Sequence, residues 1–248
     1  MTLTPTPSAA TKTGVFWTQF PVTALTGADG RPVDWSDHQA AHRAVMRLFP
    51  PRLPGSAKDR RASSGILYRV DVLVPGEPGV VLVQSLVPPE LTPALSRTTE
   101  VSRRGWEFEV GDPITLRVAV NPVRRTTRYY VDSDKETLRE GSNSRGETPV
   151  RRPDGRRDRS NSKQTATVVT PEEMPAWLDD RLGGALEGVE VVNHFRDTSL
   201  SGRQKLVVDT FDLTAKVQDP AAFSQIRLEG LGRGKSYGCG LITARKAG

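Results

Sequence analysis

Strand and helix patterns follow one another in the same order twice along this chain of 248 residues, and this repetition restricts the fold more than any other feature. In the first half, apolar residues at periods of two and of 3.6 indicate a strand, a helix, a strand hairpin, a short helical or irregular piece and a further strand. These expected elements lie at residues 15–22, 35–49, 68–74 with 80–87, 89–100 and 106–110.

The second half has the same order and begins with an alternating strand at 114–121. Thr170 and Glu173 form a capping box with Pro171 at the first helical position, which opens a helix that ends before Gly183. Two further strands, a helix that begins at Asp219-Pro220 and a last strand are expected at residues 189–195, 206–217, 219–228 and 237–244.

Two successive β-α-β-β-α-β units predict an α+β fold with two ferredoxin-like (RRM-like) domains in tandem. Residues 1–13 are polar and contain prolines, so we expect a flexible tail there. The expected N-terminal domain covers residues 14–111 and the C-terminal domain covers residues 112–248.

A polar, arginine-rich insertion interrupts the second domain at residues 124–163. Its serine, asparagine, glycine and proline content is typical of a loop that is mobile without a ligand. Two interpretations remain, a solvated loop and a surface that binds the phosphate backbone of a nucleic acid, and the clustering of cations favours the second. The cations are Arg124, Arg125, Arg128, Arg151, Arg152, Arg156, Arg157, Arg159 and Lys163.

The net charge of +6 also favours a polyanionic partner. The single cysteine, Cys239, excludes an internal disulfide framework and is compatible with a reducing compartment. Residues 1–13 lack the apolar core of a signal peptide, and no apolar stretch approaches the roughly 18–20 residues that span a bilayer. We therefore expect a cytoplasmic protein with no membrane partner.

The glycine-rich run at 230–240 predicts a phosphate-binding turn, because glycine lets backbone amides converge and two cations lie within the run. Glu229 replaces the first glycine of a Walker A loop, and Tyr237 replaces the third glycine of a dinucleotide fingerprint, so both motifs are excluded. The alternative is a turn that only allows a helix and a strand to pack closely. The candidate binding residues are Gly232, Arg233, Gly234, Lys235 and Ser236.

The chain has three histidines, His38, His42 and His194. His38 and His42 are four residues apart and share one face of the expected first helix. A zincin helix would have glutamate where Gln39 stands, and no further ligand cluster is visible in the sequence, so we expect no metal and no cofactor. A histidine without a functional role is the default interpretation of each.

Five stretches, in order along the chain, resemble the CasE family, the endoribonucleases that process CRISPR RNA in type I-E systems. One is the run from His42 to Leu48-Phe49-Pro50, and another is the closing Gly232-x-Gly-Lys-Ser-x-Gly-Cys-Gly-Leu-Ile242. The others lie at 81–85, 116–122 and 176–178, so the resemblance covers residues 15–244. The tandem ferredoxin-like pattern agrees with it independently.

The resemblance implies that His42 is the catalytic residue. The family cuts CRISPR repeat RNA at the base of its hairpin without a metal, and leaves a 2′,3′-cyclic phosphate and a 5′-hydroxyl end. The resemblance further implies partners, namely the hairpin of the mature crRNA and the other subunits of the type I-E surveillance complex, and we expect a monomer in isolation. Some members have a tyrosine where this chain has Gln39, which cannot act as an acid or base.

The same resemblance places the glycine-rich run against RNA and assigns Arg203 and Lys205 to a basic hairpin that grips the RNA stem. Arg43, next to His42, is a further candidate for charge at the phosphate. The alternative to an endoribonuclease is a non-catalytic RNA-binding scaffold of a CRISPR ribonucleoprotein, which the missing tyrosine motivates. An RNA-recognition-motif protein unrelated to CRISPR is a weaker alternative, because the aromatic third-strand pattern is missing in both halves.

Overall fold

The computed structural model describes residues 14–56, 60–71, 79–105, 107–130, 137–142, 162–201 and 204–247. Contacts divide the chain into two compact units. The main unit combines residues up to Asn121 with those from Leu178 onward, and the inserted unit is Pro122–Trp177. No helix among these described residues is both long enough and apolar enough to span a membrane.

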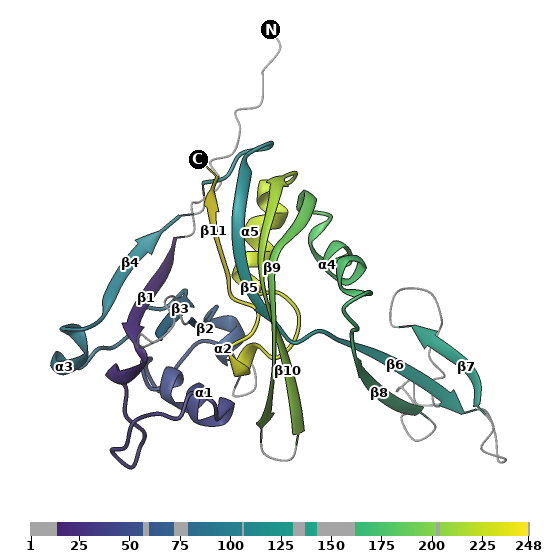
Figure 1. Cartoon of the computed structure of the whole chain (residues 1–248). Coiled ribbons are helices and arrows are strands. Elements are labelled where there is room, and N and C mark those ends of the chain that lie inside the picture. The colour runs from purple at the N-terminus through teal and green to yellow at the C-terminus, as the bar shows by residue number, and fades with distance from the viewer. Residues whose placement is uncertain are drawn as a thin grey trace, which may run out of the picture. The chain divides into compact units, whose positions relative to one another are not determined.

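The first half of the main unit contains a four-stranded antiparallel sheet in the order β2-β3-β1-β4 (Figure 1). The strands are β1 Val15–Pro21, β2 Leu67–Asp71, β3 Val80–Ser85 and β4 Glu100–Arg104. The helices of this half are the 3-10 turn η1 Val22–Ala24, α1 His38–Met46, α2 Arg60–Ser63 and α3 Pro93–Ser96. The first and third strands lie in the centre of the sheet, as a ferredoxin-like domain requires.

Helix α1 begins after Asp37, whose carboxylate accepts hydrogen bonds from the amides of Gln39 and Ala40 at 2.8 and 3.2 Å. Ala41 and Val45, four residues apart, are buried on one face. That face forms a hydrophobic core with Ile66, which precedes β2, and with four residues of the first sheet, namely Phe20, Tyr68, Val81 and Val83. Burial of one face leaves the polar residues of α1 beside or outside the core.

The second half of the main unit repeats this topology in a sheet of order β11-β5-β10-β9. The strands are β5 Pro113–Val120, β9 Leu186–Ser201, β10 Gln204–Val217 and β11 Ile242–Lys246. The helices are α4 Met174–Leu182, which begins in the inserted unit, α5 Pro220–Glu229 and the 3-10 turn η2 Lys235–Tyr237. Because the first and third strands are again central, the tandem ferredoxin-like fold is confirmed. The exact boundary at 111–112 stays a prediction.

The predicted helix caps of the second half form as expected. The Glu173 carboxylate accepts a hydrogen bond from the Thr170 amide at 3.2 Å, although regular helix begins only at Met174. The Asp219 carboxylate accepts from the amides of Ala221 and Ala222 at 2.9 and 3.0 Å. These local signals locate both helices because each satisfies backbone donors that the helix itself cannot pair.

Two expected strands are displaced. The fourth strand of the first half is Glu100–Arg104, not 106–110, because an exposed edge strand carries polar residues and lacks the apolar alternation that was sought. Phe108 instead packs edge-on against Phe223 of α5, with ring centroids 5.4 Å apart. The last strand begins at Ile242, since Gly240 (φ +90°) interrupts an extended path from residue 237.

The insertion at 124–163 is not a simple loop, which corrects the expectation from composition. The described residues of the inserted unit include the strands β6 Val123–Tyr130, β7 Thr137–Ser142 and β8 Ser162–Val168, in a sheet of order β7-β6-β8. Threonine and tyrosine favour strands even where few apolar residues are present. This strand preference was missed from the sequence because the segment is also rich in arginine.

Arg69 on β2 connects the two sheets of the main unit. Its guanidinium makes a bidentate ion pair with Asp71, with N–O distances of 2.7 and 2.8 Å. It also donates to the carbonyls of Arg117 on β5 and Leu241, which precedes β11, both at 2.9 Å. The hydroxyl of Thr243 accepts a further bond at 2.9 Å. The side chains of Arg69 and Asp71 are only 3% and 5% exposed, so water cannot take over their hydrogen bonds. The pair therefore links the two halves through buried, charge-assisted hydrogen bonds.

We expect Arg69→Met to lower the free energy of unfolding by about 3–5 kcal/mol, because it leaves the Asp71 carboxylate buried without its partner. The double variant Arg69→Met with Asp71→Leu should lose clearly less free energy of unfolding than the single variant, since it buries no unpaired charge. Urea denaturation of both variants measures the difference. Equal losses for the single and double variants would contradict this role of the ion pair.

Candidate active site

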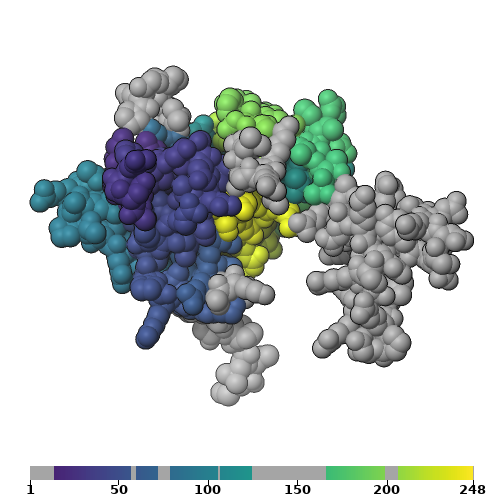
Figure 2. All heavy atoms as spheres, turned by 90° about the horizontal axis from the view of Figure 1, so that it is seen from below, coloured from purple at the N-terminus to yellow at the C-terminus, as the bar shows by residue number. Residues whose placement is uncertain are grey.

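His42 lies on α1 beside the buried face of the helix and is half-buried. α1 packs against η2, the turn formed by the glycine-rich run. Figure 2 shows this C-terminal segment, in yellow, at the surface next to the blue residues of the first half. The structure therefore brings the expected histidine and the expected phosphate-binding turn together.

The surroundings of His42 favour its neutral form. Burial lowers the pKa of the imidazole, and the positive charges of Arg61 and Arg43 lower it further. A neutral imidazole can accept a proton near neutral pH. His42 is thus suited to act as a general base.

The glycine-rich run forms a tight turn with left-handed residues on both sides of η2, Gly234 (φ +73°) and Gly238 (φ +82°). The amide of Tyr237 closes the turn by donating to the carbonyl of Gly234 at 2.7 Å. A side chain at position 238 would place its Cβ 3.3 Å from Cε2 of Tyr68. Glycine is required there both for the backbone conformation and for this close approach.

Tyr68 on β2 fixes the turn relative to the first sheet. Its hydroxyl donates to the carbonyl of Ser236 at 3.1 Å, and its side chain is almost fully buried. Burial raises the pKa of this phenol well above its usual range, so the hydroxyl stays protonated. Tyr68 therefore acts as a hydrogen-bond donor to the turn.

Two cations interact electrostatically at this turn. Lys235 begins η2 and is half-buried, and its pKa is lowered by burial and by the charge of Arg61, while Glu229 opposes the shift. Arg61 lies on the short helix α2 and was not among the predicted site residues. Nothing in the basic stretch at 52–64 distinguishes Arg61 from its neighbours in the sequence, because its electrostatic effect on His42 and Lys235 arises only in the fold.

His38, one helical turn before His42, lines a groove of about 710 Å³ together with Trp35, Tyr237 and Asp197. The rings of His38 and Tyr237 lie 6.1 Å apart. Burial lowers the pKa of His38, whereas the carboxylates of Asp197 and Asp37 raise it. The two histidines therefore have different electrostatic surroundings.

The remaining candidate residues fall into three groups. Arg43 is exposed on α1, and Arg233 and Gly232 lie in the glycine-rich run, with Arg233 in a backbone bridge to Asn121. Arg124 pairs with Glu173 at 2.8 Å within the inserted unit. For Arg125, Lys163 and Lys205 only the strand position is described, and Arg151, Arg152, Arg156, Arg157 and Arg203 lie outside the described residues.

His194 has a structural environment. It lies on β9, its ring nitrogen is 3.0 Å from the buried carboxylate of Asp209, and its ring stacks on Phe211 with centroids 4.5 Å apart. Arg196 makes a bidentate pair with the same carboxylate at 2.7 and 2.8 Å. Among the residues that the structure describes, no three His, Cys, Asp or Glu side chains form a group that could hold a metal ion.

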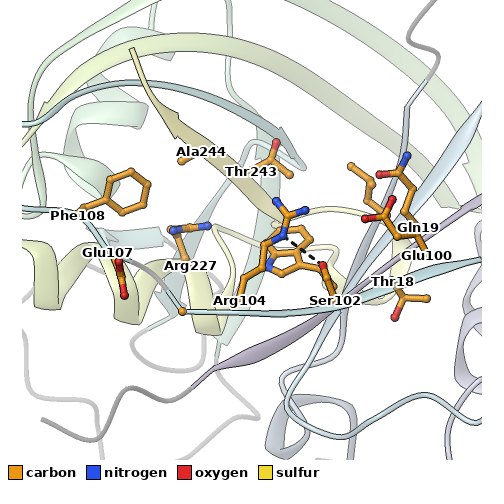
Figure 3. A pocket seen from close by; sticks show the side chains of 13 residues that line it. Thr18, Gln19, Glu100, Ser102, Arg104, Glu107, Phe108, Arg227, Thr243 and Ala244 are labelled. Atoms are coloured by element: carbon orange, nitrogen blue, oxygen red, sulfur yellow. Dashed lines mark hydrogen bonds between the residues drawn. The ribbon is translucent and has the colours of Figure 1, made fainter. Parts of the chain in front are cut away.

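A smaller cavity of about 300 Å³ opens between β1, β4, α5 and β11 (Figure 3). Arg227 lies at its wall, with its guanidinium 5.2 Å from the ring centre of Phe108 and 5.6 Å from that of Phe223. Burial lowers the pKa of Arg227 to about 10. The cavity contains none of the candidate residues, so it is separate from the site at His42.

Comparison with known proteins places this geometry in a family. A relative from Escherichia coli K12, CRISPR system Cascade subunit CasE, is 26% identical over 216 residues, which is 84% of this chain and 92% of the relative. The structure of CRISPR endoribonuclease Cse3 bound to a 19-nucleotide RNA matches with a TM-score of 0.58 and 20% identity, and covers 94% of this chain and 99% of that one.

The structure of Cse3 from Thermus thermophilus, bound to an RNA that represents a pre-cleavage complex, also matches with a TM-score of 0.58. It is 21% identical and covers 94% of this chain and 99% of that one. The family model described as CRISPR associated protein matches residues 22–246. Because this match spans nearly the whole sequence, the chain belongs to the family of CRISPR associated proteins that includes CasE.

Proposed function

We propose that this protein is an endoribonuclease that cuts CRISPR repeat RNA at the base of its hairpin. The observation that carries the proposal is the half-buried imidazole of His42 beside the cationic, glycine-rich turn at Lys235. The names of two relatives, CRISPR system Cascade subunit CasE and CRISPR endoribonuclease Cse3, support both the RNA substrate and the cleavage.

The proposed reaction is an in-line transesterification that uses no metal. The ribose 2′-oxygen attacks the adjacent phosphorus while His42 accepts its proton, so an O2′–P bond forms and the P–O5′ bond breaks. The 5′-oxygen takes up a proton from water and leaves as a hydroxyl, and the other product ends in a 2′,3′-cyclic phosphate. General base catalysis contributes about 10²–10⁴ in rate, and much of the remainder comes from alignment and from charge on the phosphate.

Lys235 and the amides of the glycine-rich turn would contact phosphates of the RNA. Two cations near one another repel, and a phosphate between them relieves that repulsion. Burial and the charge of Arg61 already lower the pKa of Lys235, so an anion bound there is stabilised more strongly than at an exposed lysine. Recognition of the RNA stem would depend mainly on A-form shape and phosphates.

We further propose that the protein keeps the hairpin of the mature crRNA and thereby becomes a subunit of the type I-E surveillance complex, in agreement with the name of the Escherichia coli relative. The arginine-rich strand β6 of the inserted unit would add phosphate contacts. An enzyme that keeps its product bound does not need rapid turnover, because each molecule cleaves only once.

A non-catalytic RNA-binding scaffold is the second candidate, because Gln39 stands where some relatives have a tyrosine. Incubation of the protein with a repeat hairpin in EDTA separates the two functions. Binding without any cut product would support the scaffold. Cleavage in EDTA would support a metal-independent endoribonuclease.

We expect His42→Ala to lower the single-turnover cleavage rate about 10²–10⁴-fold while RNA binding is retained, because the variant removes the proton acceptor and no phosphate contact. Gln39→Ala is a matched control on the same helix, since Gln39 is exposed and cannot transfer a proton. It should cleave at nearly the original rate. Undiminished cleavage by His42→Ala would refute the assignment.

We expect Lys235→Ala to weaken binding of the repeat hairpin and to reduce the slope of log affinity against log salt by about one. Lys246→Ala is the control, because Lys246 lies at the end of β11 and already pairs with Asp112 at 2.8 Å. Filter binding at a series of salt concentrations measures both. An unchanged slope for Lys235→Ala would exclude a phosphate contact at this lysine.

A further inference from the structure

One face of the β9–β10 hairpin presents an exposed aromatic ring between two polar residues. Phe195 is 65% exposed, and Asn193 and Asp197, two positions away on either side, share its face of β9. The residues across the sheet from Phe195 are Thr210 on β10 and Ala119 on β5. Because these two side chains are small, they leave the ring of Phe195 uncovered. All five residues line the groove that also contains His38.

The opposite face of β9 makes contacts within the protein. His194 and Arg196, which alternate with Phe195 along the strand, both contact the buried carboxylate of Asp209. The alternation of the strand thus directs one set of side chains into the structure and the other set, with Phe195, into the groove.

The groove adjoins the site at His42. Its lining includes His38, one helical turn before His42, and Tyr237, the last residue of the turn that begins with Lys235. The rings of His38 and Tyr237 are 6.1 Å apart. Trp35 adds a third ring, whose nitrogen donates to a backbone carbonyl at 2.9 Å. Since one helical turn advances only about 6 Å, an RNA chain bound at His42 and Lys235 has this groove beside it.

The charges of the groove suit a base better than a phosphate. Two lining aspartates already pair with two lining arginines, Asp71 with Arg69 at 2.7 Å and Asp212 with Arg117 at 2.6 Å. The third lining carboxylate, Asp197, accepts a hydrogen bond from the next amide along the chain at 2.7 Å. Carboxylate charge therefore exceeds arginine charge in the lining, which repels a phosphate. Its oxygens can still accept hydrogen bonds from the amino group of a nucleobase.

We propose that this groove holds the unpaired nucleobase immediately downstream of the cut, stacked on an aromatic ring and with its amino group bound by Asp197. This inference rests on the proposed function, in which the retained hairpin ends in the cyclic phosphate, so that the next nucleotide lies outside the stem. Unpaired bases of RNA are bound in this way, by stacking on aromatic side chains and by hydrogen bonds to their edges.

Two consequences follow for the substrate. Adenine, cytosine and guanine are preferred over uracil at this position, because uracil has carbonyl oxygens and no exocyclic amino group. A bound downstream base also helps to hold the P–O5′ bond in line with the attacking oxygen. The groove acts on the substrate and not on the retained hairpin, because the downstream fragment leaves after cleavage.

The first test changes the RNA. Repeat hairpins carry adenine, cytosine, guanine, uracil or no base at the downstream nucleotide, and a 2′-deoxyribose at the attacking position prevents cleavage while affinity is measured. Removal of the base should lower the affinity about 5–100-fold. An abasic nucleotide several positions further downstream is the control and should have little effect.

The second test changes the protein. Phe195→Ala should weaken binding of the hairpin with a downstream adenine, but not binding of the abasic hairpin or of the mature hairpin without a downstream nucleotide. Val192→Ala is the matched control, because Val192 is 67% exposed on the same strand and does not line the groove. Asp197→Asn should reduce the preference against uracil, since an amide can also donate to a carbonyl oxygen.

A fluorescence measurement makes the comparison without any cleavage. With 2-aminopurine as the downstream base of the non-cleavable hairpin, stacking in the groove should quench the fluorescence when the unmodified protein binds. The quenching should be lost with Phe195→Ala and kept with Val192→Ala.

Two results would overturn the inference. One is equal affinity of the unmodified protein for the abasic and the adenine hairpins. The other is an equal loss of affinity for both RNAs in Phe195→Ala, which would assign Phe195 to the stem or to a different partner. In either case the proposed function stands if the unmodified protein cleaves and His42→Ala does not. Absence of cleavage by the unmodified protein would refute the proposed function, and the fluorescence measurement would still decide whether the groove binds the base.

Discussion

The ion pair of Arg69 with Asp71 is the contact on which the geometry of the site depends. Through this pair, β2 of the first sheet is hydrogen-bonded to β5 and to the segment that leads into β11. The glycine-rich turn lies immediately before that segment, and Tyr68, adjacent to Arg69, holds the turn by its hydroxyl. A buried charge pair tolerates little displacement, because each partner loses its compensation when they separate. The pair therefore fixes the first sheet, on which α1 packs, relative to the glycine-rich turn.

The fold places two histidines of one helix near charges of opposite sign. Cations from α1 and α2 act on His42, whereas carboxylates from α1 and β9 act on His38. Burial lowers the pKa of both imidazoles, and the neighbouring charges add to that shift at His42 and oppose it at His38. Segments far apart in the sequence bring these charges to two turns of one helix.

Local signals in the sequence were sufficient for much of the fold. The caps at Glu173 and Asp219 located two helices because each acts within a few residues. β4 was misplaced because an edge strand needs no apolar alternation, and the strands of the insertion were missed because arginine obscured the β preference of threonine. The electrostatic effect of Arg61 on His42, Lys235 and Tyr68 could not be predicted, since these residues lie on three other elements. The predictions for His42 and for the turn at Lys235 came from family resemblance and glycine spacing.

In the proposed reaction a ribose hydroxyl attacks the neighbouring phosphate, with His42 as its proton acceptor. Mass spectrometry of the RNA ends, after cleavage of a repeat hairpin in EDTA, identifies the attacking oxygen. We expect a 2′,3′-cyclic phosphate on the upstream fragment and a 5′-hydroxyl on the downstream fragment, because the attacking oxygen belongs to the RNA itself. A 3′-hydroxyl paired with a 5′-phosphate would show that water is the nucleophile and would contradict the proposed reaction.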